Sequence, residues 1–196
     1  MPGVPASGPR HPRIRHPRIG HPDHRHPPQK ETPMTDTRIV DKTIEPLTDE
    51  AFAPFGVVLH SLEDGTPCTP QEASLDLAEG APRFYLMRLE DKPPTFTGIT
   101  RHRRTTQTLL SADAREWIIA VAPATDGAPD LDAVRAFTVP AGVAITMAKG
   151  TWHSGPFFEG DAMSFVNLEL EDTNIVDHDT YRLDRELGVR VNLHVA

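Results

Sequence analysis

Two short segments of the chain carry a histidine beside a strand-like run. The earlier reads Thr100-x-His102 with Gln107 five residues further on, and the later reads Gly150-Thr151-Trp152-His153. Imidazole exchanges protons near neutral pH, so His102 and His153 are candidate acid–base catalysts. Alternate residues of a strand face the same side, which lets such segments aim polar groups into a small β-barrel. We therefore predict that both histidines lie at the mouth of a barrel.

Side chains next to these histidines could hold a substrate. The candidate substrate-binding residues are Arg101, Gln107, Lys149 and Trp152. The planar guanidinium of Arg101 can pair with a carboxylate through two hydrogen bonds, and Lys149 offers a point charge. Strand alternation puts Arg101 and His102 on opposite faces, so Arg101 reaches an inward-facing site only through a bulge or across a dimer interface. The remaining histidines of the body belong to no such group and are interpreted as structural or surface residues: His60, His178 and His194.

Composition limits the class of protein. At 196 residues and 38% hydrophobic, the chain can bury one core but hardly two. The single cysteine, Cys68, excludes an internal disulfide and favours a reducing compartment. The sequence contains no apolar run of the ~20 residues that a membrane helix needs, and no secretory signal. We expect a cytoplasmic protein without a membrane partner.

Charge is unevenly distributed along the chain. Residues 1–33 hold six Lys/Arg and two Asp/Glu, a net of +4, so the chain's net charge of −8 leaves −12 on residues 34–196. Such a body repels polyanions, which argues against nucleic acid as a partner. A small anionic substrate remains possible if a local Arg or Lys binds it.

The first 33 residues form a distinct segment. His-Pro recurs at positions 11, 16, 21 and 26, and nine of the chain's twenty prolines lie here. Proline density removes backbone donors, and the segment has little apolar area to bury, so we expect a disordered extension. Its five histidines could alternatively bind transition metals. Met34 could be the natural start, and residues 34–196 are predicted to form the single folded domain.

Short β-rich runs dominate that domain. Thr48 is a predicted N-cap for a short helix that ends at Gly56. The expected strands, bounded by Gly, Pro or Asp, cover residues 57–59, 83–89, 96–103, 106–110, 117–122, 134–139, 143–147 and 163–170. Many short strands at close spacing indicate a sandwich or barrel. We predict an all-β fold, a cupin-type double-stranded β-helix (a jelly-roll barrel) with a few short helices.

The chain resembles the ureidoglycolate lyase family of the cupin superfamily. Cupin signatures, H-x-H-x(3,4)-E and G-x-x-H, correspond in spacing to Thr100-x-His102-x4-Gln107 and Gly150-x-x-His153. The resemblance extends from about residue 44 to about residue 179. Its most specific pieces are Pro46-Leu47, Glu50-Ala51-Phe52, Phe55-Gly56, Arg101-His102, Thr106-Gln107, Pro129-Asp130-Leu131, Arg135-Ala136-Phe137 and Gly150-Thr151-Trp152-His153.

The resemblance implies a carbon–nitrogen lyase that cleaves (S)-ureidoglycolate to glyoxylate and urea, a step of purine nitrogen recovery through allantoin. It also implies a homodimer, because cupin sheets commonly pair across subunits. This sequence departs from the family pattern at four positions, where Thr100, Arg103, Ala148 and Ser154 replace Glu, Pro, His and His. These departures leave open a cupin-like protein that binds a small carboxylate without turnover.

The same departures bear on metal binding. Cupins hold a metal with imidazoles and a carboxylate, whereas Thr100 and Gln107 offer neutral oxygens, which are poor ligands for transition metals. We expect no metal or other cofactor, although two imidazoles could hold a divalent ion weakly. A metal-dependent cupin oxygenase or isomerase is the third alternative.

Overall fold

The computed structural model describes residues 37–70, 72 and 75–196. The histidine- and proline-rich segment 1–33 lies outside the described residues, so its predicted disorder and the domain boundary at Met34 stay predictions. Within the described part no helix is long and apolar enough to cross a membrane.

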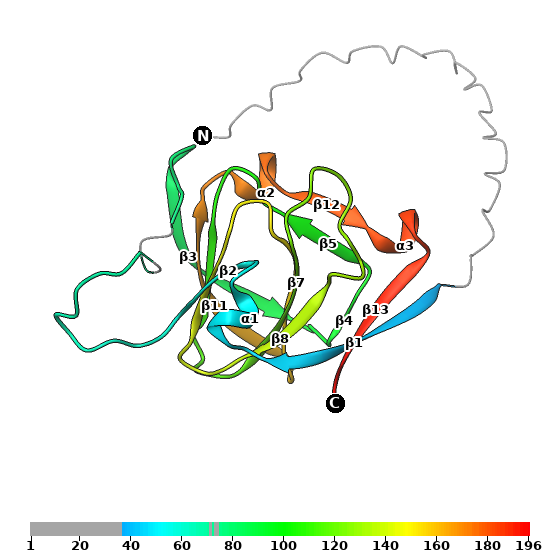
Figure 1. Ribbon diagram of the computed structural model, residues 1–196, viewed down its shortest axis with the longest axis horizontal. Helices are drawn as coiled ribbons and strands as arrows, with labels where there is room; N and C mark the ends of the chain where they lie inside the picture. The colour runs from blue at the N-terminus through cyan, green and yellow to red at the C-terminus, as the bar shows by residue number, and fades with distance from the viewer. Residues whose placement is uncertain (1–36, 71, 73–74) are drawn as a thin grey trace, which may run out of the picture. The chain divides into compact units, whose positions relative to one another are not determined.

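Two β-sheets make up the fold (Figure 1). The larger has the order β12 (Asp179–Arg182), β5 (Gly98–Arg101), β10 (Trp152–Phe157), β7 (Trp117–Ala122), β8 (Arg135–Val139), β1 (Arg38–Pro46), β13 (Val189–Val195) and β4 (Thr95–Phe96). The smaller has the order β2 (Gly56–Leu59), β9 (Ala144–Met147), β6 (Gln107–Ser111), β11 (Ala162–Leu170) and β3 (Pro82–Glu90). Three four-residue helices complete the description: α1 (Asp49–Phe52), α2 (Thr173–Val176) and α3 (Leu183–Glu186). The predicted all-β barrel with few short helices is confirmed.

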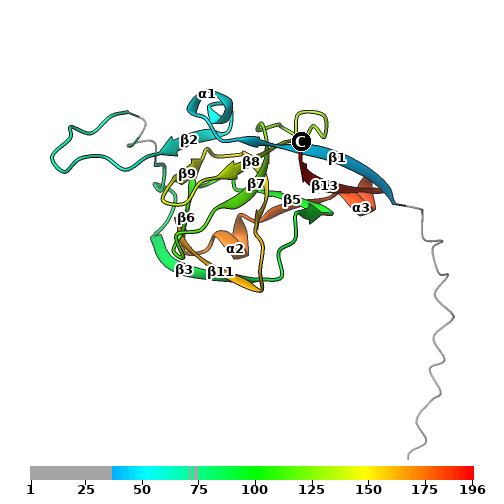
Figure 2. The ribbon, with the colours of Figure 1, turned by 90° about the horizontal axis from the view of Figure 1, so that it is seen from below.

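The main core lies between the two sheets. Strand β7 contributes Trp117, Ile119 and Val121 to it, and β11 contributes Met163 and Phe165. Figure 2 shows β1 and β13 on one side of the molecule and β3 and β11 on the other. A cluster of inward-facing side chains therefore fills the barrel, as strand alternation requires.

A second apolar cluster covers the other face of the larger sheet. Ala120 and Ala122 of β7 and Trp152 of β10 belong to it. The sheet curls far enough for both of its faces to be buried, because β13, β4 and α3 fold over the back of β7 and β10. Every strand that carries a candidate site residue is thus fixed by packing.

Local sequence explains the start of the domain. Thr48 caps α1 as predicted, its Oγ1 accepting a hydrogen bond from the amide of Ala51 at 3.1 Å. The helix ends at Phe52, earlier than expected, and the chain then turns into β2 at Gly56. A Cβ there would lie 1.9 Å from the carbonyl oxygen of Thr146, so only glycine permits the β2–β9 pairing.

Two strands were not predicted from the sequence. β12 is only four residues long, and nothing local distinguishes it from a loop. β13 shows a clear alternation of buried Val189, Val191 and Leu193, which is the pattern of a half-buried strand. It pairs in parallel with β1, from the opposite end of the domain.

Candidate active site

The structure brings His102 and His153 together, with ring centroids 5.0 Å apart. In the antiparallel pairing of β10, His153 lies opposite Thr100 of β5 and Val121 of β7. Val121 belongs to the core between the sheets, so His153 faces the barrel interior. The two histidine segments are also joined directly, since the amide of Gly150 donates to the carbonyl of His102 at 2.6 Å.

Backbone carbonyls fix the orientation of both rings. Nδ1 of His102 lies 2.6 Å from the carbonyl oxygen of Asp177, and Nδ1 of His153 lies 3.1 Å from that of Thr151. A carbonyl can only accept, so each Nδ1 carries the hydrogen and each neutral ring keeps its lone pair on Nε2. The pair therefore presents two nitrogens that can each accept a proton.

Burial keeps both imidazoles neutral. It lowers the pKa of His153 to about 3, and the neighbouring His102 lowers it further, while the hydrogen bond to Thr151 opposes the shift. Burial also lowers the pKa of His102, against the opposing effects of the Asp177 carbonyl and the charge of Glu169. At neutral pH each ring is thus an acceptor of protons and not a donor of a second one.

His178 is a third imidazole at this site, although the sequence interpretation placed it on the surface or in a structural role. Its ring centroid lies 5.7 Å from that of His102, and the residue lines the same cavity as His153. It precedes β12, whose pairing with β5 brings it there. Only that pairing, which has no short-range sequence signal, could have revealed it.

A buried polar network lies deeper in the barrel. Gln107 donates through Nε2 to Glu169 at 2.9 Å, and the Tyr85 hydroxyl donates to the same carboxylate at 3.0 Å. Glu169 is only 1% exposed, and no Lys, Arg or His pairs with it among the described residues. Burial, with the charge of Glu169, raises the pKa of Tyr85.

Sequence reasoning missed Glu169 and Tyr85. Alternation along β11 could have found Glu169, because it shares a face with the core residues Met163 and Phe165. Gln107, a predicted substrate ligand, uses its amide nitrogen within this network.

Arg101 and Trp152 lie on the opposite face of the sheet from His102. Arg101 pairs with Asp179 at 2.8 Å, donates to the carbonyl of Thr125 at 2.5 Å and stacks over the Trp152 ring at 4.1 Å. Trp152 is buried and donates to Thr125 Oγ1. Their predicted contact with substrate stays a prediction, and in this arrangement both side chains brace the wall behind the site.

Lys149, also predicted to bind substrate, forms ion pairs instead. Its ammonium lies 2.7 Å from Asp76 and 3.0 Å from Glu79. The backbone of Asp76 exchanges hydrogen bonds with Thr106. Lys149 thus ties the segment before β3 to the Gly150 corner, and its predicted contact with substrate also stays a prediction.

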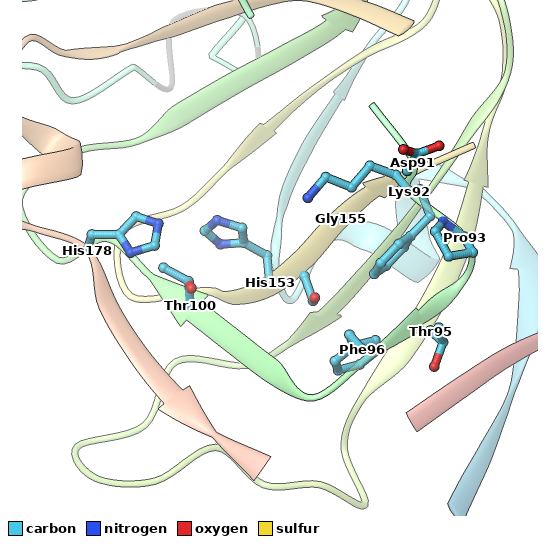
Figure 3. A pocket seen from close by; sticks show the side chains of 11 residues that line it. Asp91, Lys92, Pro93, Thr95, Phe96, Thr100, His153, Gly155 and His178 are labelled. Atoms are coloured by element: carbon cyan, nitrogen blue, oxygen red, sulfur yellow. The ribbon is translucent and has the colours of Figure 1, made fainter. Parts of the chain in front are cut away.

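A cavity of about 430 Å³ opens beside His153 (Figure 3). It is lined by Asp91, Lys92, Pro93, Thr95, Phe96, Thr100, His153, Ser154, Gly155, Phe157 and His178. Its size suits a small molecule. One end is polar, with imidazoles and hydroxyls, and the other carries the stacked rings of Phe96 and Phe157, 5.8 Å apart. Such a cavity can hold a short polar acid against Nε2 of His153.

The donor set fits a transition metal poorly. Among the residues that the structure describes, no group of three or more His, Cys, Asp or Glu side chains could hold a metal ion. At the positions of the cupin signature, His102 and His153 are accompanied by Thr100 and Gln107, which lack the carboxylate of the superfamily site. The chemistry is therefore derived from the side chains themselves.

Comparison with known proteins decides the family. The ureidoglycolate lyase family model matches residues 40–190. The chain belongs to the ureidoglycolate lyase family. A ureidoglycolate lyase of Burkholderia mallei is 32% identical over 139 residues, covering 65% of this chain and 81% of that protein. One from Schizosaccharomyces pombe is 30% identical over 141 residues, covering 56% of this chain and 74% of that protein. The predicted family and its carbon–nitrogen lyase class are confirmed.

Solved structures give weaker likenesses. RmlC from Streptococcus suis in complex with dTDP-D-xylose has a TM-score of 0.39 and 14% identity, with 64% of this chain and 54% of that chain covered. Oxalate decarboxylase of Bacillus subtilis has a TM-score of 0.37 and 17% identity, with 55% of this chain and 25% of that chain covered. The chain thus spans about half of the first and a quarter of the second, and the fold description above rests on the strand pairing.

The lowered pKa of His153 predicts acid sensitivity. In the unfolded chain this histidine takes up a proton near its ordinary pKa of 6.5, whereas in the folded chain it does so only near 3. Stability should therefore fall as pH drops below about 6.5, by up to about 1.4 kcal/mol per pH unit for one such group. Thermal melts between pH 7 and pH 5 should show a declining Tm, and His153→Gln should flatten the decline.

His194→Gln, at an exposed position of β13, is the matched control and should melt with the same pH dependence as the native chain. If His153→Gln and the native chain lose Tm equally on acidification, His153 is not the group responsible.

Proposed function

We propose that this protein cleaves (S)-ureidoglycolate to glyoxylate and urea, in the recovery of purine nitrogen through allantoin. One observation carries the proposal within the family: two neutral imidazoles, fixed by carbonyls, hold Nε2 free beside a cavity sized for a small acid. The reaction moves one proton from the carbinol oxygen to the departing urea nitrogen, so it needs no redox group.

His153 is the proposed proton carrier. Its Nε2 accepts the carbinol proton, the C–N bond breaks as the aldehyde carbonyl of glyoxylate forms, and the imidazolium gives the proton to the urea nitrogen. His102, with its ring 5.0 Å away, is the second acid–base group on this path. A bound anion beside His153 favours the protonated ring and so raises its pKa from the low value of the empty site.

Gln107 and Glu169 support the ureido end of the substrate in this proposal. Nε2 of Gln107 is held by Glu169, which leaves the Gln107 amide oxygen to accept from a substrate N–H. We do not assign a metal to the reaction, and the cavity residues named above supply every proton transfer.

A homodimer is proposed through the outer face of the smaller sheet. On the edge strand β3, Phe84 and Leu86 are 73% and 68% exposed, and they lie opposite Leu168 and Val166 of β11. Exposed apolar rows on an edge strand mark an interaction site. A second copy is the occupant we propose, since a two-fold pairing buries the same patch on both chains. The exposed thiol of Cys68 supports a reducing, cytoplasmic compartment.

His153→Ala should lower kcat for ureidoglycolate about a hundredfold or more, because it removes one positioned acid–base group. His194→Ala should leave kcat unchanged. Glyoxylate release, measured with purified native and variant chains, is the readout. A native chain that releases no glyoxylate above the spontaneous rate, yet is stabilised by glyoxylate, would instead support a carboxylate-binding protein.

Metal removal should leave activity intact. A chain that starts at Met34 avoids the separate histidine-rich segment, which could bind nickel and mislead the count. After dialysis against EDTA it should contain well under one metal per chain and keep most of its turnover. Stoichiometric metal that resists dialysis, with activity lost on its forced removal, would contradict a metal-free mechanism.

Leu86→Glu should convert a dimer to a monomer, because a charge would be buried in an apolar interface. Light scattering after gel filtration measures the mass. Ile175→Glu, which places the same charge at an exposed site on α2, should remain dimeric. A native chain that elutes as a monomer at micromolar concentration rules the interface out.

A further inference from the structure

The substrate is an anion, and the body of the chain is strongly acidic, so a cation must lie in the cavity. The two cations predicted from the sequence are engaged elsewhere, Arg101 with Asp179 and Lys149 with Asp76 and Glu79. The carboxylate of the substrate therefore needs another partner.

Lys92 has the position that this role requires. It lines the cavity with His153 and Thr100, and Figure 3 shows its side chain extended along the cavity, with the ammonium on the side of His153. The residue is half-buried, and its ammonium has no hydrogen-bond or ion-pair partner among the described residues.

The backbone under Lys92 is fixed. The Lys92 carbonyl accepts from the amide of Phe158 at 3.0 Å, and the preceding Asp91 amide donates to Asp161 at 3.1 Å. Pro93 and Pro94 follow and limit the backbone further. A long side chain on a fixed base can reach into the cavity, while the segment that carries it stays tied to the turn after β10.

We propose that Lys92 determines specificity by binding the substrate carboxylate, with the carbinol carbon held between its ammonium and Nε2 of His153. The stacked rings of Phe96 and Phe157 line the same cavity and exclude water from one side, which strengthens the charge pair. The ligand class is a two-carbon 2-hydroxy or 2-oxo acid, and an uncharged amide of the same shape is rejected.

This inference rests on the proposed function for the reacting group, but carboxylate binding can be measured without turnover. Oxamate is a suitable probe because it has a carboxylate and an amide on two carbons, and oxamide is its uncharged counterpart. Full-length native chain should bind oxamate and not oxamide in titration calorimetry.

Lys92→Met should weaken oxamate binding and raise KM for ureidoglycolate about 10- to 100-fold, the scale of a lost charged hydrogen bond, with a smaller effect on kcat. Lys92→Arg should restore most of the oxamate affinity. The control is Lys42→Met, since Lys42 is remote on β1 and donates to the carbonyl of Asp132. This variant should behave as native.

The two proposals can fail separately. If the native chain turns ureidoglycolate over and Lys92→Met keeps its KM and its oxamate affinity, Lys92 is not the anchor and the lyase function stands. If the native chain shows no turnover but loses oxamate binding with Lys92→Met, the anchor stands and the lyase function fails. A native chain that binds oxamate and oxamide equally also overturns the anchor.

Discussion

Strand β10 lies between β5 and β7, and the register of this three-strand arrangement determines what faces the barrel. Opposite Thr100 and Val121, His153 points inward while its neighbour Trp152 points into the second apolar cluster. A shift of one residue would exchange the two, burying an imidazole among apolar side chains and aiming an indole at the cavity. Burial of both faces of this sheet makes such a shift costly, which is why two cores are needed to hold one histidine.

The same arrangement explains how polar groups are tolerated inside the barrel. Each buried imidazole satisfies one nitrogen with a main-chain carbonyl, and the buried carboxylate of Glu169 accepts from Gln107 and Tyr85. These hydrogen bonds offset desolvation without placing a fixed positive charge against the carboxylate. The imidazoles consequently stay neutral, as a group that must accept a proton requires.

Much of the barrel could be predicted because its strands are short, β-branched and bounded by turn residues. The approach of His102 and His153 could also be predicted, since alternation and the shared spacing of two segments define it. Arg101 and Lys149 show the limit: charge alone suggests a substrate ligand, but partners distant in sequence, Asp179 and Asp76, decide where each charge is used. His178 and Lys92 lie in segments without periodicity, and only tertiary pairing places them beside the cavity.

The carbonyl anchors of the two rings have a consequence for sequence drift. Thr151 and Asp177 hold the imidazoles through main-chain oxygens, which every amino acid possesses. Exchange of either side chain leaves the anchoring atom in place, provided that the local backbone keeps its path. The tautomer of each ring can thus be inherited across relatives whose residues at these positions differ, and alignments would show variable columns where the chemistry is constant.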